Sequence, residues 1–225
     1  MALTGAEAIA AIKIKGAVTM FLGGPTGSGK TYFTRRLIKN RREMFEDYPE
    51  AVHYCYVEWQ PKLFGEMQAG GIHFHQGLPT LEIIRNWSTE AGGKHMLLIL
   101  DDLQIQISES KEMATVFTII SHHLCISVIY LCQNINHQGR AARDISLNCH
   151  YLVLFNSKRD KLQISHLARQ IFPGQNQFLM QAYENAVVSR DHGYILIDLH
   201  PLSKREYMVR TDIFPGEFPI IYQPE

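Results

Sequence analysis

A glycine-rich stretch follows the first apolar run of the chain and has the composition of a phosphate-binding loop. The apolar run covers residues 17–22, and the stretch after it fits the pattern G-x-x-x-x-G-K-[ST]. Glycines let successive backbone N–H groups converge on phosphate oxygens, and the N-terminus of the following helix adds positive potential. The sequence therefore predicts a nucleotide triphosphate site formed by Gly24, Pro25, Thr26, Gly27, Ser28, Gly29, Lys30 and Thr31.

Two side chains of this loop carry the predicted chemistry. Lys30 is expected to reach the β- and γ-phosphates, and Thr31 is expected to ligate Mg²⁺, which prefers oxygen ligands. The alternative is a chance glycine-rich turn. A β-branched and aromatic run before the loop and a helical pattern after it favour the nucleotide site, because the motif needs that order.

A second candidate group ends the apolar run at residues 96–100. Asp101 and Asp102 follow that run directly, and the carboxyl ends of buried strands face the crevice where open α/β sheets bind ligands. We expect Asp101 to hold the magnesium through water and Asp102 to polarise the water that attacks the γ-phosphate. The alternative is a strand that runs into a polar turn.

A third polar group ends the apolar run at residues 126–132. Gln133 follows that run, and an amide beside a nucleotide can bond both the γ-phosphate and the attacking water. The sequence therefore indicates a sensor residue, and the alternative is a polar strand end.

These groups need strands alternating with helices to position them. Strands are expected at 17–22, 52–57, 72–75, 96–100, 126–132 and 151–155, with a hairpin from 194–199 and 207–211. Helices are expected at 30–45, 61–68, 81–91, after Ser110, at 160–171 and at 176–188. The alternation predicts an α/β fold with a mostly parallel sheet flanked by helices and a C-terminal edge hairpin. We expect an N-terminal extension at 1–16, one domain at 17–215 and a C-terminal tail at 216–225.

Composition excludes some classes of protein. The formal net charge is zero and 46% of residues are hydrophobic, so a strongly basic, histone-like binder is ruled out. A basic run, Arg35, Arg36, Lys39, Arg41 and Arg42, reads better as a solvated helix face than as a DNA contact. No apolar run has the length of a bilayer span and no secretory leader is evident, so we expect a soluble, intracellular protein without membrane contact.

The histidines and cysteines are numerous enough to suggest a metal site, but their spacing does not support one. Two of the eleven histidines alternate in His73-Phe-His75 and two are adjacent at His122 and His123, but neither pair has further ligands nearby. The four cysteines form no C-x-x-C pair. Structural or solvated histidines and buried free thiols are therefore expected.

In order along the chain, Gly24-Pro-Thr-Gly-Ser-Gly-Lys-Thr31, Leu-Leu-Ile-Leu-Asp-Asp102 and Tyr-Leu-Cys-Gln-Asn134 resemble the Walker A, Walker B and sensor segments of the additional-strand, RecA-like P-loop ATPases of the FtsK/HerA superfamily. Segments further on resemble the packaging ATPases of poxviruses and of Polinton (Maverick) virus-like transposons. These segments are residues 138–148, 157–160, 166–173 and 193–200.

This resemblance implies an ATP-driven motor that assembles as a homo-oligomeric ring and drives double-stranded DNA into a capsid. ATP and Mg²⁺ would be its cofactors, a capsid or portal protein a further partner, and the host nucleus or a virion assembly site its location. Many members of the superfamily carry glutamate at the position of Asp102. The resemblance also implies an arginine finger acting in trans, for which Arg143 is favoured over Arg140, Arg159 and Arg169 because its loop follows the sensor strand.

Two other classes of protein stay open. A nucleoside or nucleotide kinase shares the phosphate loop but needs an acceptor pocket and usually an arginine-rich lid, and no such insert is evident in the sequence. A nucleotide-binding switch or adaptor protein hydrolyses its nucleotide slowly. Asp102 and Gln133 together argue against this class, because both would serve hydrolysis.

Overall fold

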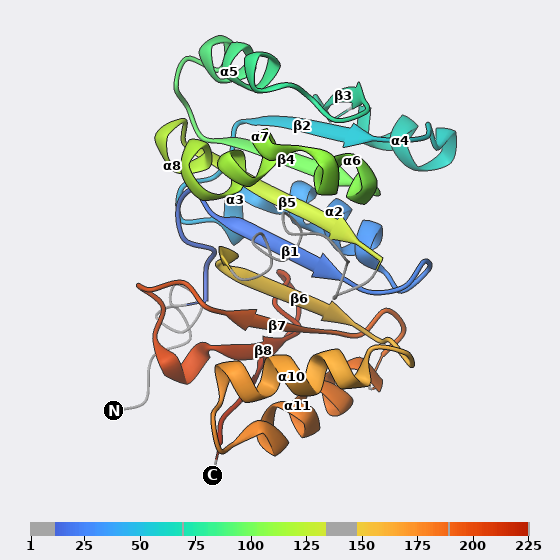
Figure 1. The fold of residues 1–225 in the computed structure, drawn as a ribbon, viewed down its shortest axis with the longest axis vertical. Coiled ribbons are helices and arrows are strands. Elements are labelled where there is room, and N and C mark those ends of the chain that lie inside the picture. Colours follow the sequence, from blue (N-terminus) through green and yellow to red (C-terminus); the bar gives the residue numbers. More distant parts are fainter. Residues whose placement is uncertain (1–11, 69, 134–147, 189, 225) are drawn as a thin grey trace.

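The structure, a computed structural model, describes residues 12–68, 70–133, 148–188 and 190–224, and its centre is one sheet (Figure 1). In this described part the sheet has nine strands in the order β3-β2-β4-β5-β1-β6-β7-β8-β9. The strands are β1 (Thr19–Gly23), β2 (Ala51–Tyr56), β3 (His73–Gln76), β4 (Met96–Asp101), β5 (Ile126–Cys132), β6 (Tyr151–Phe155), β7 (Tyr194–Asp198), β8 (Val209–Thr211) and β9 (Ile220–Tyr222).

The strand directions confirm the predicted α/β fold. β1 to β6 pair in parallel, and β7, β8 and β9 are added antiparallel at one side. β5 lies between β1 and β4, so a further strand separates the phosphate loop from the two carboxylates. This insertion is the additional-strand arrangement. The C-terminal strands supply the predicted edge hairpin, and β9 comes from the segment expected as a tail.

Helices cover both faces of the sheet. One face buries side chains of α2 and α4, and the other buries side chains of α5, α6, α7, α10 and α11. The helical segments are α2 (Lys30–Lys39), α3 (Arg41–Met44), α4 (Pro61–Gln68), α5 (Leu81–Glu90), α6 (Gln104–Glu109), α7 (Lys111–Thr115), the π-helical turn η1 (Val116–Ile120), α8 (Ser121–His123), α10 (Lys161–Ile171), α11 (Asn176–Val188) and the 3-10 turn η2 (Arg205–Tyr207). None of the helices in the described part of the chain is both long and apolar enough to span a bilayer.

Helix ends follow the expected capping chemistry. The Thr80 and Ser110 hydroxyls accept hydrogen bonds from the backbone N–H groups of Ile83 and Met113 at 3.3 Å, so both residues are N-caps. The single helix expected at 30–45 is wrong. Asn40 interrupts it, because its side chain donates to the Arg36 carbonyl at 2.8 Å and its backbone leaves the helical region.

Candidate nucleotide site

The phosphate loop joins the end of β1 to the start of α2, and its glycines are required by geometry. Gly27 and Gly29 have φ values of 77° and 111°, which favour glycine. A Cβ on Gly24 would lie 2.8 Å from the Phe155 Cβ and from the Ser28 Oγ. The chain therefore turns tightly here only because these positions lack side chains.

Polar groups inside the loop fit a phosphate. Lys30 Nζ is buried and donates to the carbonyl oxygens of Gly24 and Pro25, at 2.6 and 3.0 Å. Burial lowers the pKa of Lys30, while Asp102 and Asp101 raise it. Ser28 Oγ is buried without a hydrogen-bond partner in the described part of the chain. An anion on this loop would satisfy both the cation and the hydroxyl.

The register of the sheet brings the predicted site residues to one edge. Gly23 of β1 pairs with Cys132 of β5, and Leu131 of β5 pairs with Asp101 of β4. The residues that follow these strand ends, Gly24, Gln133 and Asp102, therefore leave the sheet side by side. The predictions from three separate stretches of sequence converge at the carboxyl edge of the parallel strands.

Asp101 is buried and its environment is unusual for a carboxylate. It is 6% exposed, and the Tyr54 hydroxyl donates to its Oδ2 at 2.6 Å. Burial raises the pKa of Asp101 to about 6, and the Tyr54 hydrogen bond opposes that rise. In the described part of the chain no Lys or Arg forms an ion pair with it.

This donor set suits magnesium. Thr31 lies in the first turn of α2 and offers a hydroxyl, and Asp101 offers a carboxylate that forms no ion pair with a Lys or Arg of the described residues. Hard divalent cations prefer such oxygen ligands, and a divalent charge would favour the ionised form of Asp101. The residues present therefore fit Mg²⁺ bound together with a triphosphate.

Asp102 and Gln133 meet at the same edge. Gln133 Nε2 donates to Asp102 Oδ1 at 3.2 Å, and Asp102 has a φ of 56°, which is uncommon for a residue other than glycine. Gln104 of α6 helps to hold this strand end, because its Oε1 accepts from the backbone N–H of Gln133 at 3.4 Å. The expected base and the expected sensor are thus in direct contact.

Three residues of the site were not predicted from the sequence. Tyr54 supports Asp101, Gln104 supports Gln133, and His192 packs against the loop at Gly29. The strand pattern of residues 52–57 places Tyr54 on an inward face, but its partner depends on β2 lying next to β4. Gln104 lies on α6, a short helix that was not predicted from the sequence.

The favoured arginine finger lies outside the described residues. Arg143 and Arg140 both fall within 134–147, so neither is located. Of the other candidates, Arg169 donates to Ser165 Oγ at 3.5 Å on its own helix, and Arg159 is exposed after β6. The assignment of Arg143 stays a prediction.

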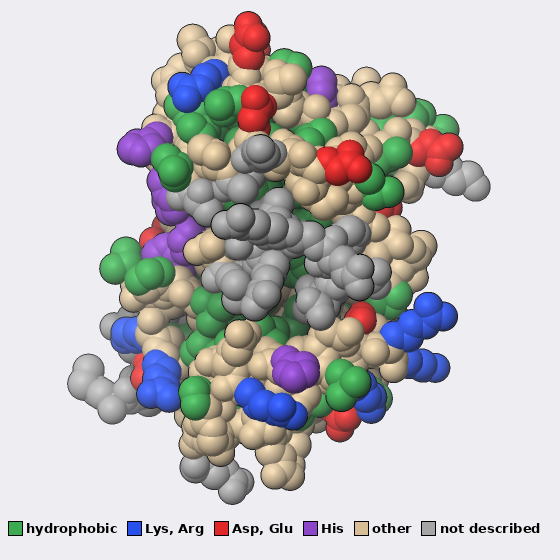
Figure 2. Space-filling view, in the orientation of Figure 1, with side chains coloured by type: hydrophobic (Ala, Val, Ile, Leu, Met, Phe, Trp, Pro, Cys, Tyr) green, Lys and Arg blue, Asp and Glu red, His purple; other side chains and the backbone are tan. Residues whose placement is uncertain are grey.

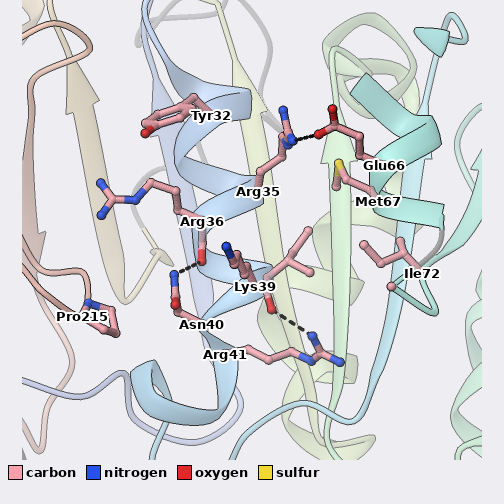
Figure 3. Close-up of a pocket in the computed structure, with 12 residues that line it drawn as sticks. Tyr32, Arg35, Arg36, Lys39, Asn40, Arg41, Glu66, Met67, Ile72 and Pro215 are labelled. Carbon is pink, nitrogen blue, oxygen red and sulfur yellow. Dashed lines mark hydrogen bonds and ion pairs between the residues drawn. The ribbon is translucent and has the colours of Figure 1, made fainter. Parts of the chain in front are cut away.

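The basic run on α2 and α3 borders a cleft of about 660 Å³ against α4 (Figure 3). Most of its cations already have partners in the protein. Arg35 pairs with Glu66, Arg36 pairs with Glu217 at 2.6 Å, and Arg41 donates to two backbone carbonyls. The structure therefore favours the interpretation that these cations stabilise the helix surface, rather than contact DNA.

Apart from His192, which packs against the phosphate loop, most histidines with described ring contacts belong to two other groups. Figure 2 shows histidine side chains at the left side of the molecule, where the parallel strands begin. The ring of His150 contacts the rings of His122 and His200. His53 stacks on Trp87 with ring centroids 4.2 Å apart. Among the described residues no three His, Cys, Asp or Glu side chains converge as metal ligands, and none of the four cysteines forms a disulfide.

The fold and this site define a P-loop ATPase of the RecA-like kind. Two solved structures share the fold. B204, the DNA-packaging ATPase from Sulfolobus turreted icosahedral virus, superposes with a TM-score of 0.54 at 9% identity over 93% of this chain and 98% of that one. The genome packaging NTPase B204 from Sulfolobus turreted icosahedral virus 2, in complex with ATP-gammaS, gives 0.52 at 10% identity over 92% and 97%. No curated sequence matches the chain.

The chain belongs to the poxvirus A32 protein family. The profile of that family matches residues 76–198, which is more than half of the 225 residues. The matched range begins in β3 and ends with β7, so it contains Asp101, Asp102 and Gln133 but not the phosphate loop. The family relationship and the loop are therefore independent observations, and they agree.

Proposed function

We propose that this protein is an ATP-driven motor that moves double-stranded DNA into a viral or virus-like capsid. The observation that carries the proposal is the contact between Asp102 and Gln133 at the mouth of the phosphate loop. A base and a γ-phosphate sensor held together serve hydrolysis better than nucleotide storage. Membership of the poxvirus A32 family and the fold shared with viral packaging NTPases support DNA as the cargo.

The proposed roles follow from the environment of each residue. The loop from Gly24 to Thr31 holds the phosphates, with Lys30 donating to their oxygens. Thr31 and Asp101 hold Mg²⁺, which supplies charge stabilisation on the transferred phosphoryl group. Asp102 accepts the proton of the attacking water, and Gln133 orients that water against the γ-phosphate. Asp101 is buried and accepts a hydrogen bond from Tyr54, so bulk water has little access to it.

The first experiment measures ATP hydrolysis with and without double-stranded DNA, beside phosphate transfer to nucleosides. We expect DNA-stimulated hydrolysis and no transfer, and Lys30→Ala is expected to abolish turnover because the cation at the phosphates is lost. Lys39→Ala, an exposed lysine on the same helix, is the control. Transfer to a nucleoside would identify a kinase, and tight binding without turnover would identify a switch protein.

The second experiment separates water activation from metal binding. Asp102→Asn keeps the size of the side chain and loses its charge, so ATP binds while turnover falls roughly a hundredfold or more. Asp101→Asn instead weakens the dependence on magnesium. Equal and mild effects of the two substitutions would contradict these roles.

The motor further requires a ring in which Arg143 reaches the nucleotide of a neighbouring subunit. An arginine supplied in trans is worth about three to five orders of magnitude in rate. Arg143→Ala should therefore bind ATP without turnover, and mixing it with Lys30→Ala on DNA should restore activity. If Arg143→Ala is active alone, Arg159 and Arg140 are tested next. If no arginine variant is rescued although assembly is demonstrated, catalysis is completed within one subunit.

We also propose a capsid or portal protein as the partner of the ring and the site of virion assembly as its location. Co-purification of the ring with assembling capsids tests both.

A further inference from the structure

A second cavity opens beside the phosphate loop, with a volume of about 200 Å³. Gly29 of the loop lies at its border. The walls come from three segments that reach the same edge of the sheet, namely the first turns of α2, the residues before β7 and the residues after β8. The lining includes Tyr32, Arg36, Arg190, His192, Asp212 and Phe214.

The wall of this cavity is continuous with the loop. A Cβ on Gly29 would lie 2.6 Å from the Cβ of His192, so the backbone of Gly29 is in close contact with the His192 side chain. His192 itself has a φ of 60°, in the left-handed region. The segment before β7 therefore packs against the loop, and this cavity lies beside a molecule whose phosphates are on the loop.

Two flat rings border the cavity. Tyr32 is 53% exposed, and its ring centroid lies 5.7 Å from that of His192 at an interplanar angle of 38°. Arg36 is not free to bind a further anion, because it pairs with Glu217 at 2.6 Å and lies over the Phe214 ring at 4.1 Å. Exposed aromatic rings beside a cavity offer stacking surface for a flat heterocycle.

Asp212 offers a hydrogen-bond acceptor in the same wall. It is 5% exposed, and Arg190 Nη2 approaches its Oδ2 at 2.9 Å. That contact does not have the geometry of a hydrogen bond, since Asp212 Oδ2 has no hydrogen-bond partner among the described residues. The ion pair with Arg190 leaves this oxygen without a hydrogen bond within the described chain, and an N–H group of a ligand would supply one.

We infer that this cavity is the subsite for the base of the nucleotide, with the base stacked on Tyr32 and its exocyclic amine bonded to Asp212. The inference rests on the proposed function, because it takes the triphosphate to be on the loop. A carboxylate that faces position 6 of the purine accepts from the amino group of adenine and repels the carbonyl oxygen of hypoxanthine or guanine. The subsite therefore selects ATP over ITP and GTP.

The test is a binding titration of the whole chain with ATP, ITP and inorganic tripolyphosphate, each with Mg²⁺. Tyr32→Ala should weaken ATP binding roughly tenfold, the value of one stacked base, and leave tripolyphosphate binding unchanged. Asp212→Asn should bring the affinities for ATP and ITP together, because an amide both donates and accepts. Phe218→Ala and Glu184→Gln are controls at an exposed ring and an exposed carboxylate elsewhere. Neither should change the affinity for ATP or for tripolyphosphate.

Each contrary result overturns a different statement. If Tyr32→Ala leaves ATP binding unchanged, or weakens ATP and tripolyphosphate equally, the base lies elsewhere and the loop assignment still stands. If the unaltered chain binds ATP and ITP equally, Asp212 does not read the base. If the unaltered chain does not bind tripolyphosphate, the proposed function fails before the subsite is reached. Because Tyr32 is exposed, its substitution tests stacking even if Asp212→Asn does not fold.

Discussion

Two apolar strands of the sheet each end in a buried aspartate. The two aspartates lie at opposite ends of the parallel strands. Asp101 ends β4 at the edge of the phosphate loop. Asp198 ends β7, which runs antiparallel to β6, so it lies at the edge where the parallel strands begin (Figure 1). The two residues are 6% and 3% exposed. Their exposed fractions are nearly the same, but different side chains contact them.

The difference lies in how each charge is compensated. Asp198 Oδ2 lies 3.0 Å from Arg210 Nη1, and the fully buried Arg210 also donates to the carbonyl oxygens of Tyr207 and Ile12. Asp101 has a hydroxyl from Tyr54 and, in the described part of the chain, no paired cation. An arginine of the protein compensates the charge of Asp198. The charge of Asp101 can be compensated by a cation that binds with the nucleotide.

The largest expected effect comes from breaking the pair of Arg210 and Asp198. Arg210→Leu leaves Asp198 buried without a cation, which costs about 3 to 5 kcal/mol of the free energy of unfolding. Denaturant unfolding at neutral pH measures this loss. The double variant Arg210→Leu, Asp198→Leu removes both charges and should recover most of the stability. If the double variant is as unstable as the single one, the lost carbonyl contacts of Arg210 and not the orphaned charge explain the effect.

The same comparison shows what the sequence could predict. Met96-Leu-Leu-Ile-Leu-Asp101 and Tyr194-Ile-Leu-Ile-Asp198 are alike, as apolar runs that end in aspartate. The phosphate loop upstream and Asp102 next to Asp101 indicated which run carries chemistry. The strands and most helices could be located because hydrophobic periodicity and capping residues are local signals.

What could not be predicted depends on contacts between distant segments. Tyr54 supports Asp101 only because β2 and β4 are neighbours, and Arg210 meets Asp198 only because β7 and β8 are antiparallel. The base subsite joins α2 to residues about 160 and 180 positions further along the chain. No short pattern encodes such pairings, since strand order decides them.

The second expected effect has opposite signs at the two carboxylates. Asp101→Asn keeps an acceptor for Tyr54 and removes a charge that is unfavourable when buried, so it should raise the free energy of unfolding at pH 7.5 by about 2 to 3 kcal/mol. Asp198→Asn removes a charge that Arg210 requires and should lower it. Thermal and denaturant unfolding of both variants without nucleotide measure the two changes. Two changes of the same sign would contradict the contrast drawn here.

The pH dependence of this effect follows from the direction of the pKa shift. Burial raises the pKa of Asp101 in the folded chain to about 6, above the unfolded value of about 3.9. The stability that protonated Asp101 contributes is therefore fully present below the unfolded pKa and is lost as the pH rises to about 6. The stability gained by Asp101→Asn over the unaltered chain should grow between pH 4 and pH 6 and stay constant above. A constant difference across that range would mean that Asp101 titrates normally.

A smaller effect is expected from Tyr54→Phe. The Tyr54 hydrogen bond opposes the rise in the pKa of Asp101, so its loss raises that pKa further. Magnesium binding needs the ionised carboxylate, and magnesium-dependent ATP hydrolysis should therefore require a higher pH in the variant. Loss of this hydrogen bond to a charged group should lower the free energy of unfolding by about 1.5 to 3 kcal/mol. Protonation of Asp101 partly offsets that loss. Tyr56→Phe on the same strand is the control, and an unshifted pH profile would contradict this role of Tyr54.

The smallest effect is expected at an exposed ion pair, which serves as a reference for the buried pair of Arg210 and Asp198. Lys161 Nζ and Glu184 Oε1 lie 3.2 Å apart between α10 and α11, with side chains 64% and 56% exposed. Solvent screens such a pair and both side chains lose entropy when it forms, so Lys161→Ala should change the free energy of unfolding by about 0.2 to 1 kcal/mol. The same denaturant series as for Arg210→Leu measures it, and added salt should remove most of the difference. Since the distance in this pair is close to that between Arg210 and Asp198, a similar loss in both variants would mean that proximity, and not burial, sets the value of an ion pair in this fold. The contrast between Asp198 and Asp101 would then lose its physical basis.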